Sequence, residues 1–369
     1  MNALELWSRA WEGLTRRIDS LLFTAALAIV LVGLVTLYSA TDQSMARIES
    51  QLMSLCFALF LMWVVANIAP EKLARIAVPL YILAVALLVA VALFGTVVNG
   101  SRRWLNVGVA RFQPSELMKI ALPLMLAWYF QKFEGRIGWK DFLLAAVLIV
   151  VPVYLIKRQP DLGTAMLIAA SGCYVLYLAG LSWKIIVGLM ALAGGIAPLL
   201  WPMLHDYQRE RILTFIDPSR DPLGAGYHSM QASIALGSGG IVGKGWLNGT
   251  QAHLDFLPER HTDFIFAVYG EEFGLIGNVL LIALYMLLIG RAMVITANAS
   301  TLFTRLMAGA VTLMFFTYAF VNMAMVSGLM PVVGVPLPLV SYGGTALISL
   351  FIGLGILMSV QAHRKLVAG

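Results

Sequence analysis

The sequence is poor in charge. Only 12% of its 369 residues are Asp, Glu, Lys or Arg, whereas 60% are hydrophobic, and soluble domains usually carry about a quarter charged residues. The chain is therefore predicted to be an integral membrane protein and not a water-soluble globule. Its Lys and Arg residues are dispersed between apolar segments although the net charge is +6, so the pattern argues against a nucleic-acid-binding surface.

Cysteines and linker sequences are scarce as well. The two cysteines, Cys56 and Cys173, lie inside long apolar runs. Such positions suit small core residues and lack the closely spaced partners of a metal site, so redox chemistry is not expected. No stretch rich in proline, glycine and serine divides the chain, which is interpreted as a single membrane domain over residues 1–369.

Long hydrophobic runs are abundant. A membrane span needs about 20 mainly apolar residues, or somewhat fewer where flanking side chains snorkel. The first run follows two arginines, but it is too long for a signal peptide and is interpreted as a span. About ten runs predict an all-α polytopic bundle: residues 21–38, 52–68, 76–98, 117–130, 142–156, 162–178, 185–200, 264–289, 306–326 and 345–360.

The Lys and Arg distribution predicts the orientation. If the N-terminus is cytoplasmic, more of these residues fall in inner loops than in short outer loops, as the positive-inside rule requires. An even number of spans then places the C-terminus in the cytoplasm too. Residues 205–262 become one large periplasmic loop.

Cations on the outer side are disfavoured by the same rule and invite an explanation. An anionic ligand at the outer leaflet supplies one, and ordinary solvated loop charges are the alternative. Glycines in the large loop would let backbone amides approach an anion, although their spacing matches neither a P-loop nor a dinucleotide fingerprint. The candidate cations are Arg103, Arg111, Arg209, Arg211, Lys244 and Arg260.

Ionisable residues stand in or at the ends of several predicted spans. Glu116 and Lys119 share one helix face, which suits a structural ion pair or the wall of a polar substrate cavity. Asp161 opens the sixth span, where it can cap the helix or line such a cavity. Glu271 and Glu272 lie about two turns into the eighth span, and helix geometry predicts that only one of them faces the interior.

The end of the large loop carries a candidate general base. Asp263 stands at the predicted membrane boundary, close to Arg260 and His261. It can cap the eighth span or accept a proton in a partly dry site. His261 is the rival base because its ordinary pKa lies near neutrality.

The last two predicted spans are joined by an apolar, proline-rich segment, residues 331–344. Proline lacks an amide donor and interrupts helices, so this segment cannot be a regular helix. Irregular backbone at membrane depth is tolerated only where protein buries it or where it lines a cavity. We therefore expect a re-entrant or cavity-lining cap.

Five motifs in the same order resemble the SEDS family of shape, elongation, division and sporulation proteins. The resemblance extends from the first span to the last. Residues 259–263 and 331–336 are more similar to the elongation branch, RodA, than to the division branch, FtsW. The five motifs occupy residues 103–105, 113–116, 159–164, 257–264 and 336–344.

The resemblance implies a peptidoglycan glycosyltransferase of the bacterial inner membrane with a periplasmic active site. Such an enzyme polymerises lipid II into β-1,4-linked glycan strands for cell elongation and rod shape, and releases undecaprenyl diphosphate. The family's essential aspartate falls on Asp263, its intramembrane acid–base pair on Glu116 and Lys119, and its membrane-corner aspartate on Asp161. The implied partner is a class B penicillin-binding protein, PBP2, which supplies the transpeptidase within the elongation machinery.

Transfer from an α-linked diphosphate donor to a β-glycoside inverts the anomeric carbon. It needs a base at the acceptor hydroxyl and charge stabilisation at the leaving diphosphate. Asp263 would supply the base; the outer cations, with a divalent cation such as Mg²⁺ or Mn²⁺, are candidates for holding the diphosphate. The alternatives are a lipid II flippase or other transporter, and a noncatalytic membrane scaffold for the penicillin-binding protein. A transporter often shows internal repeats, and none is visible between the halves of the sequence.

Overall fold

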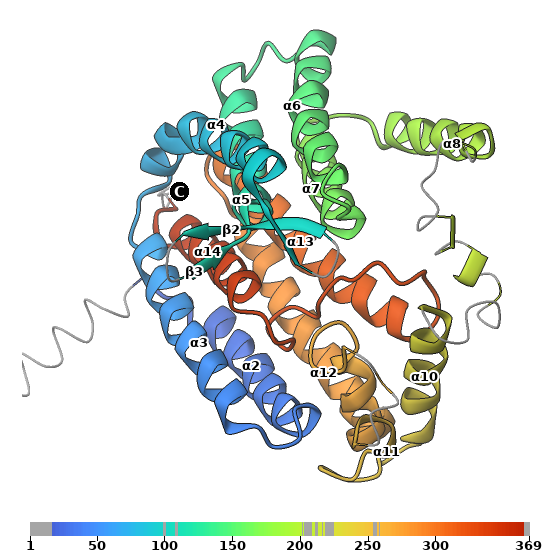
Figure 1. Cartoon of the computed structure of the whole chain (residues 1–369). Helices are drawn as coiled ribbons and strands as arrows, with labels where there is room; N and C mark the ends of the chain where they lie inside the picture. Colours follow the sequence, from blue (N-terminus) through green and yellow to red (C-terminus); the bar gives the residue numbers. More distant parts are fainter. Residues whose placement is uncertain are drawn as a thin grey trace, which may run out of the picture.

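The computed structural model describes residues 17–98, 101–107, 110–200, 202, 209–210, 213–215, 217, 225–253, 257 and 259–364. This part of the chain is almost entirely helical (Figure 1). A long helix occupies each of the predicted spans, so the predicted fold class is confirmed. These helices are α2 (Ser20–Ala40), α3 (Met45–Ala66), α4 (Pro70–Phe94), α5 (Pro114–Lys132), α6 (Trp139–Lys157), α7 (Leu162–Leu178), α8 (Trp183–Leu200), α12 (Ile265–Ala297), α13 (Leu302–Val326) and α14 (Gly344–Ala362). The described part of the large loop includes helices α10 (Ala225–Ser238) and α11 (Thr250–His253).

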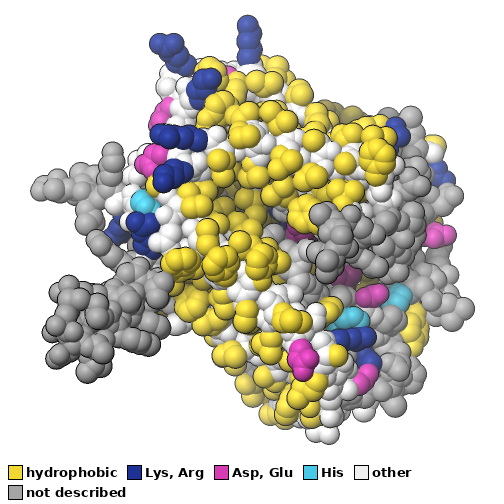
Figure 2. All heavy atoms as spheres, turned by 60° about the vertical axis from the view of Figure 1, so that its left-hand side comes forward, with side chains coloured by type: hydrophobic (Ala, Val, Ile, Leu, Met, Phe, Trp, Pro, Cys, Tyr) yellow, Lys and Arg dark blue, Asp and Glu magenta, His cyan; other side chains and the backbone are white. Residues whose placement is uncertain are grey.

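The outside of the bundle is apolar. Figure 2 shows hydrophobic side chains spread across one broad face, and many large apolar side chains are exposed. Among the described helices, seven are long and apolar enough to cross a membrane: α2, α3, α4, α6, α12, α13 and α14. The chain is therefore a multi-pass membrane protein, and the count of ten spans stays a prediction.

Helices α13 and α14 form the centre of the bundle. In each of them 67% of the most apolar 18-residue stretch is buried, against 22% in α3 and α6 at the periphery. Small residues let the helices approach closely. A Cβ on Gly355 of α14 would lie only 2.6 Å from the carbonyl oxygen of Met62 in α3, which is the close contact that membrane helices use in place of a hydrophobic driving force.

The connection between α4 and α5 is a small sheet that the sequence did not predict. Its strands are β1 (Thr96–Val98), β2 (Ser101–Val107) and β3 (Ala110–Phe112), antiparallel in the order β1-β2-β3. The prediction that the third span runs to residue 98 is wrong, because α4 ends at Phe94 and Gly95 adopts an extended conformation. Strand β2 carries Arg103 towards the corner between α6 and α7.

Both cysteines lie on the outside of the bundle. Cys56 and Cys173 are exposed, so the prediction that they are core residues is wrong. Lipid is as apolar as a protein core, and hydrophobicity in the sequence therefore does not separate the lipid-facing side of a helix from its buried side.

Polar contacts bring the connections at one end of the bundle together. Arg260, just before α12, pairs with Asp42 in the α2–α3 turn. Arg103, between α4 and α5, binds the α6–α7 corner. The start of α7 touches the α13–α14 connection, since a Cβ on Gly163 would lie 2.5 Å from the carbonyl oxygen of Val333. We call this the Asp263 end.

Other contacts gather at the opposite end. Arg17 donates a 2.6 Å hydrogen bond to the carbonyl of Asn67 in the α3–α4 turn. Asp19, which caps α2, pairs with Arg291 near the end of α12 at 2.5 Å. Among the helices joined by these contacts, successive interhelical connections therefore lie at alternate ends of the bundle. This is expected for helices that each cross the bilayer.

Candidate active site

Asp263 lies in a turn that directly precedes α12. The amides of Thr262 and Phe264 both donate to the carbonyl of Glu259, at 3.1 and 3.3 Å. Asp263 does not occupy the N-cap position of α12, because the N-cap is Phe264, whose side chain makes no capping hydrogen bond. The turn continues through Phe264 before helical geometry begins at Ile265, so Asp263 stands one residue too early to cap.

Three successive main-chain carbonyls, those of residues 261–263, hold this turn against the end of the bundle. The first accepts from the amide of Tyr342 at 2.9 Å. The second accepts from the hydroxyl of Ser341 at 2.6 Å. The third accepts from the side-chain amide of Asn322 at 2.8 Å. Asn322 is fully buried in α13, so the backbone around Asp263 is fixed from the protein interior.

The segment between α13 and α14 forms the surface beneath the turn. It contains no helix, and Val335, Leu337 and Leu339 are each nearly fully buried, which confirms the predicted cap of irregular backbone covered by protein. Asn322 also donates to the carbonyl of Val335 at 2.7 Å and so joins this segment to the Asp263 turn. Gly334 has φ +70°, and a Cβ there would lie 3.4 Å from Oδ2 of Asp263.

Glu116 and Lys119 form the predicted ion pair. Their side chains are almost fully buried and meet at 2.6 Å. Ser349 of α14 donates to the second carboxylate oxygen of Glu116 at 2.6 Å, and the ammonium of Lys119 lies 4.9 Å from the ring centre of Tyr318. A cavity of about 20 Å³ beside Lys119 lies under the α13–α14 segment. This volume suits about one water molecule and is too small for a sugar, which favours the structural role of the pair.

Asp161 performs the predicted capping role and binds a cation as well. It accepts a 3.1 Å hydrogen bond from the amide of Thr164 in the first turn of α7. Arg103 lies 3.6 Å from the same carboxylate. The Arg103 guanidinium also donates to the carbonyls of Gln159 and Pro160. The sheet and the α6–α7 corner are thereby joined into one polar assembly.

The remaining candidate cations have protein partners where the structure describes them. Lys244 lies 2.6 Å from Glu271, and Arg209 donates to the carbonyl of Pro202 at 2.6 Å. Arg260 pairs with Asp42. The side chain of Arg111 and the whole of Arg211 lie outside the described residues.

His261 is kept neutral by its surroundings. Partial burial lowers the pKa of its imidazole below the ordinary value of 6.5, and the positive charges of Arg47 and Arg260 lower it further, against the opposing effect of Glu259. The ring lies 5.9 Å from that of Tyr342. At neutral pH His261 is therefore an uncharged neighbour of Asp263 and does not supply a positive charge.

Glu271 and Glu272 are both buried, at 0% and 1% exposure, so the prediction that only one faces the interior is wrong. Two different segments cover them. Lys244 and Thr250 of the large loop bind Glu271, while Ser39 at the end of α2 donates to Glu272. A helix that is covered on two sides can bury two adjacent residues. Helical periodicity alone does not predict this, because it only shows that adjacent residues face different directions.

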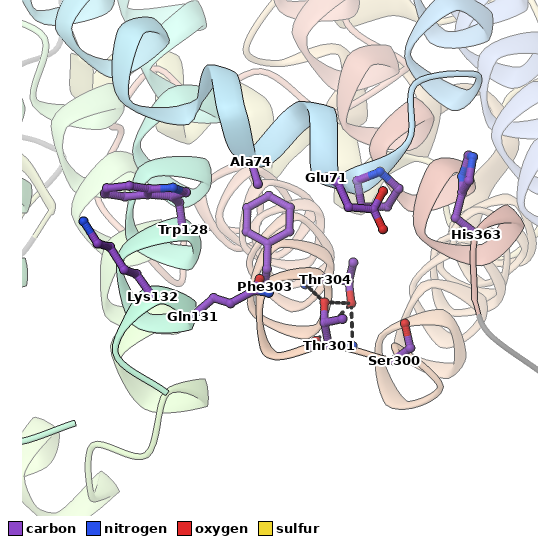
Figure 3. A pocket seen from close by; sticks show the side chains of 11 residues that line it. Glu71, Ala74, Trp128, Gln131, Lys132, Ser300, Thr301, Phe303, Thr304 and His363 are labelled. Atoms are coloured by element: carbon purple, nitrogen blue, oxygen red, sulfur yellow. Dashed lines mark hydrogen bonds between the residues drawn. The ribbon is translucent and has the colours of Figure 1, made fainter. Parts of the chain in front are cut away.

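A pocket of about 290 Å³ opens at the other end of the bundle, among the starts of α4 and α13 and the ends of α5 and α14 (Figure 3). Trp128 and Lys132 lie at one side of it and Glu71 and His363 at the other. Helix α13 begins beside this pocket and reaches the Asp263 turn only near its other end, at Asn322. The pocket is therefore remote from the candidate base.

No group of three or more His, Cys, Asp or Glu side chains in the described part of the chain is placed to hold a metal ion. The divalent cation expected beside the diphosphate therefore stays a prediction.

Several residues of this site were not found from the sequence. Asn322 and Ser349 are buried polar side chains inside mainly apolar helices, and Gln159 is buried at the α6–α7 corner, where it donates to the carbonyl of Leu88 at 3.1 Å. A usable signal was present, because an isolated amide or hydroxyl in a membrane span usually needs a protein partner. The identity of each partner depends on contacts that are distant in the sequence.

Comparison with known proteins gives consistent matches over nearly the whole chain. A family of cell cycle proteins, FtsW, RodA and SpoVE, matches residues 18–366. The peptidoglycan glycosyltransferase MrdB of Escherichia coli (strain K12) is 50% identical over 352 residues, which are 95% of each chain.

Solved structures also match the chain over nearly its whole length. A chain from a study of polymerisation and crosslinking by a peptidoglycan synthase complex has a TM-score of 0.83 and 35% identity, covering 94% of this chain and 98% of that one. An aspartate-to-alanine mutant of the rod shape determining protein RodA of Thermus thermophilus has a TM-score of 0.72 and 30% identity, with the same coverage.

Proposed function

The chain belongs to the FtsW, RodA and SpoVE family and is a peptidoglycan glycosyltransferase, and from that premise we propose that it polymerises lipid II with Asp263 as the general base. The observation that carries the proposal is the fixed turn of residues 261–263. Three side-chain or backbone donors hold its carbonyls. A base must be within hydrogen-bond reach of the proton that it removes, and a fixed backbone provides that precision.

The reaction requires one proton transfer to the protein. The Asp263 carboxylate accepts the proton of the acceptor sugar's hydroxyl while the hydroxyl oxygen attacks the anomeric carbon of the donor. The bond from that carbon to the diphosphate breaks, and its electron pair leaves with undecaprenyl diphosphate. The diphosphate departs without protonation, so a second carboxylic acid, as in glycosidases, is not needed.

The cations at the Asp263 end are the candidates for stabilising the diphosphate. Arg103, Arg260 and Lys244 already contact carboxylates or carbonyls of the protein. Because these contacts hold the cations in place before the substrate binds, little reorganisation is needed during the reaction. We propose that they attract and stabilise the anion together, in preference to a single dedicated ligand.

The proposed site faces the periplasm. The Lys and Arg distribution supports an outer position for the Asp263 end, and Arg17 and Arg291 at the opposite end fit the cytoplasmic side. A class B penicillin-binding protein, PBP2 in the elongation branch, is the proposed partner. The structural neighbour from a peptidoglycan synthase complex supports an assembly of this kind.

Transport is the less favoured alternative. A flippase needs a polar path through the bundle, whereas the Glu116–Lys119 pair is closed in by neighbouring side chains beside a cavity of about 20 Å³. The relatives that match over nearly full length are named as glycosyltransferases.

The test is polymerisation by the purified protein with its penicillin-binding partner. Incubation with lipid II should give a ladder of glycan chains on a gel, and substitution of Asp263 should abolish it. Translocation of lipid II across proteoliposomes without any glycan product would refute the proposed reaction.

A further inference from the structure

Helix α12 is broken at Gly274. This residue has φ +65° and ψ −160°, far from helical values. In a regular helix the amides of residues 275 and 276 would donate to the carbonyls of residues 271 and 272. The break removes both hydrogen bonds, and four backbone groups need other partners.

The large loop supplies all four partners. The amides of Lys244 and Gly245 donate to carbonyls 271 and 272, each at 3.0 Å. The amides of Leu275 and Ile276 donate to carbonyls 240 and 241, at 2.9 and 3.1 Å. The loop segment 239–246 is therefore inserted into the break of the helix, and Figure 1 shows the chain after α10 lying against α12.

Glycines make the insertion possible. A Cβ on Gly243 would lie 2.1 Å from the carbonyl oxygen of Glu272, and one on Gly239 would lie 2.1 Å from that of Gly270. These distances are shorter than any real Cβ contact. The sequence suggested an anion-binding role for the glycines of this loop. Gly239 and Gly243 instead allow the loop backbone to approach the backbone of α12 closely.

The side chain of Glu271 binds the loop residues that follow Gly243. Its carboxylate, which is fully buried, accepts from the ammonium of Lys244 at 2.6 Å, from the amide of Thr250 at 2.9 Å and from the amide of Gln251 at 3.2 Å. The loop is thereby bound to α12 through side chains as well as through its backbone.

The length of α2 indicates how deep the inserted segment lies in the bilayer. Its cap, Asp19, pairs with Arg291 at the inner end, and Ser39 donates to Glu272 at the other. Asp19 and Ser39 are about 20 residues apart, or about 30 Å along a helix, which matches the hydrocarbon thickness of a bilayer. Glu272 therefore marks the outer boundary of the hydrocarbon, and Leu275 lies about one turn inside it.

The tip of the inserted segment is apolar and exposed. Ile241 and Val242 are 68% and 74% exposed, and they lie beside the exposed Leu275 and Ile276 of α12. Trp246 donates from its indole to the carbonyl of Val35 in α2 at 3.1 Å. A tryptophan at this level is typical of the membrane interface.

We propose that residues 239–246 are a membrane anchor of the large loop, with Ile241 and Val242 among the acyl chains of the outer leaflet. The occupant of this surface is lipid, because the exposed tip continues the lipid-facing side of α12. The anchor and the Asp263 turn are both attached to the outer part of α12, residues 265–273. If the proposed function holds, the anchor fixes the height of the base above the membrane.

Site-directed spin labelling tests the depth independently of activity. In a Cys56→Ser, Cys173→Ser background reconstituted in nanodiscs, a nitroxide at Val242→Cys should be more accessible to oxygen than to a water-soluble nickel chelate. Val279→Cys, on the lipid-facing side of α12 at 58% exposure, is the lipid control. Gln43→Cys, in the exposed α2–α3 turn, is the water control. A label at residue 242 that behaves like the one at residue 43 overturns the anchor.

Activity tests the link to the base. Val242→Asp should lower lipid II polymerisation at least tenfold in nanodiscs and leave the thermal unfolding of the protein in detergent unchanged, whereas Val242→Leu should match the wild type. Wild-type polymerisation by Val242→Asp would overturn the role in positioning. If the wild-type protein itself makes no glycan, the proposed function fails, and the spin-label result still decides the anchor.

Discussion

The position of Asp263 depends on its main chain, since the carbonyls of residues 261–263 are held by Asn322, Ser341 and Tyr342. Replacement of the carboxylate by an amide therefore removes basicity and leaves the turn in place. We expect Asp263→Asn to lower polymerisation by ~100-fold to ~10,000-fold, the range for loss of a general base.

Thermal unfolding and association with the penicillin-binding partner serve as controls and should be nearly unchanged in Asp263→Asn. The helix cap cannot confound the result, because Phe264 is the N-cap of α12. A variant that polymerises lipid II at the wild-type rate would contradict the assignment of Asp263 as the base.

His261 gives a prediction on pH. Because its pKa is lowered by burial and by nearby arginines, the imidazole is neutral in the folded protein above pH 6.5. Protonation then favours the unfolded state, so His261 destabilises the fold as pH falls below 6.5 and has no such effect above it. In His261→Gln, the loss of thermal stability between pH 7 and pH 5 should be smaller than in the wild type.

Polymerisation by the same variant at pH 7 separates the two candidate bases. His261→Gln should keep more activity than Asp263→Asn. The opposite order would assign the base to His261.

The Glu116–Lys119 pair is predicted to be structural. Removal of one member of a buried ion pair leaves an uncompensated charge and typically costs about 3–5 kcal/mol. Glu116→Ala and Lys119→Met should each lower the unfolding temperature and the activity, and the double variant with Leu at 116 and Met at 119 should recover most of the stability. Unfolding of each variant in one detergent compares the single and double changes, and equal losses of stability in all of them would argue against a structural ion pair.

At the scale of single elements, the α6–α7 corner combines a cap with a salt bridge. Asp161→Ala removes the hydrogen bond to Thr164 and should cost about 0.5–2 kcal/mol. Asp161→Asn keeps a capping oxygen but loses the charge that faces Arg103 at 3.6 Å. Differential scanning calorimetry should therefore find the stability of Asp161→Asn closer to that of the wild type than the stability of Asp161→Ala. Equal destabilisation by Ala and Asn would contradict capping as the main role.

The helices could be predicted from the sequence, and the connections largely could not. Apolar runs of span length located the ten long helices, because a bilayer demands a continuous hydrophobic surface. The strands β1–β3 were missed, since the apolar residues before Asn99 read as a continued helix. The burial of both Glu271 and Glu272 was missed because their partners, Lys244 and Ser39, come from distant segments.

At the scale of the whole molecule, the two ends of the bundle should lie on opposite sides of the membrane. A reporter that is active only in the periplasm should signal when it replaces the chain after Gly249 and stay silent when fused after Gly369. The physical basis is the excess of Lys and Arg at the end opposite Asp263. A signal from the second fusion would reverse the proposed orientation.

The site as a whole was only partly predictable. The sequence located Asp263, Glu116, Lys119 and Asp161 by motif and by helical spacing, and the structure places the last three in ion pairs or caps that short-range rules describe. The arrangement around Asp263 relies on Asn322 of α13 and on the segment before α14. The amide of Asn322 within a membrane span signals that it has a partner, but only tertiary packing decides which partner that is.

The broken helix α12 also constrains the order of biogenesis. Residues 239–246 leave the ribosome before α12 is made, so their amides and carbonyls must remain in water or at the interface until the next span is inserted. The outer third of α12 cannot complete its own backbone hydrogen bonds without them. Loop and helix complete their backbone hydrogen bonds only together, and the Asp263 turn at their edge gains its contacts with Asn322 and Ser341 only after α13 and the segment that follows it are made.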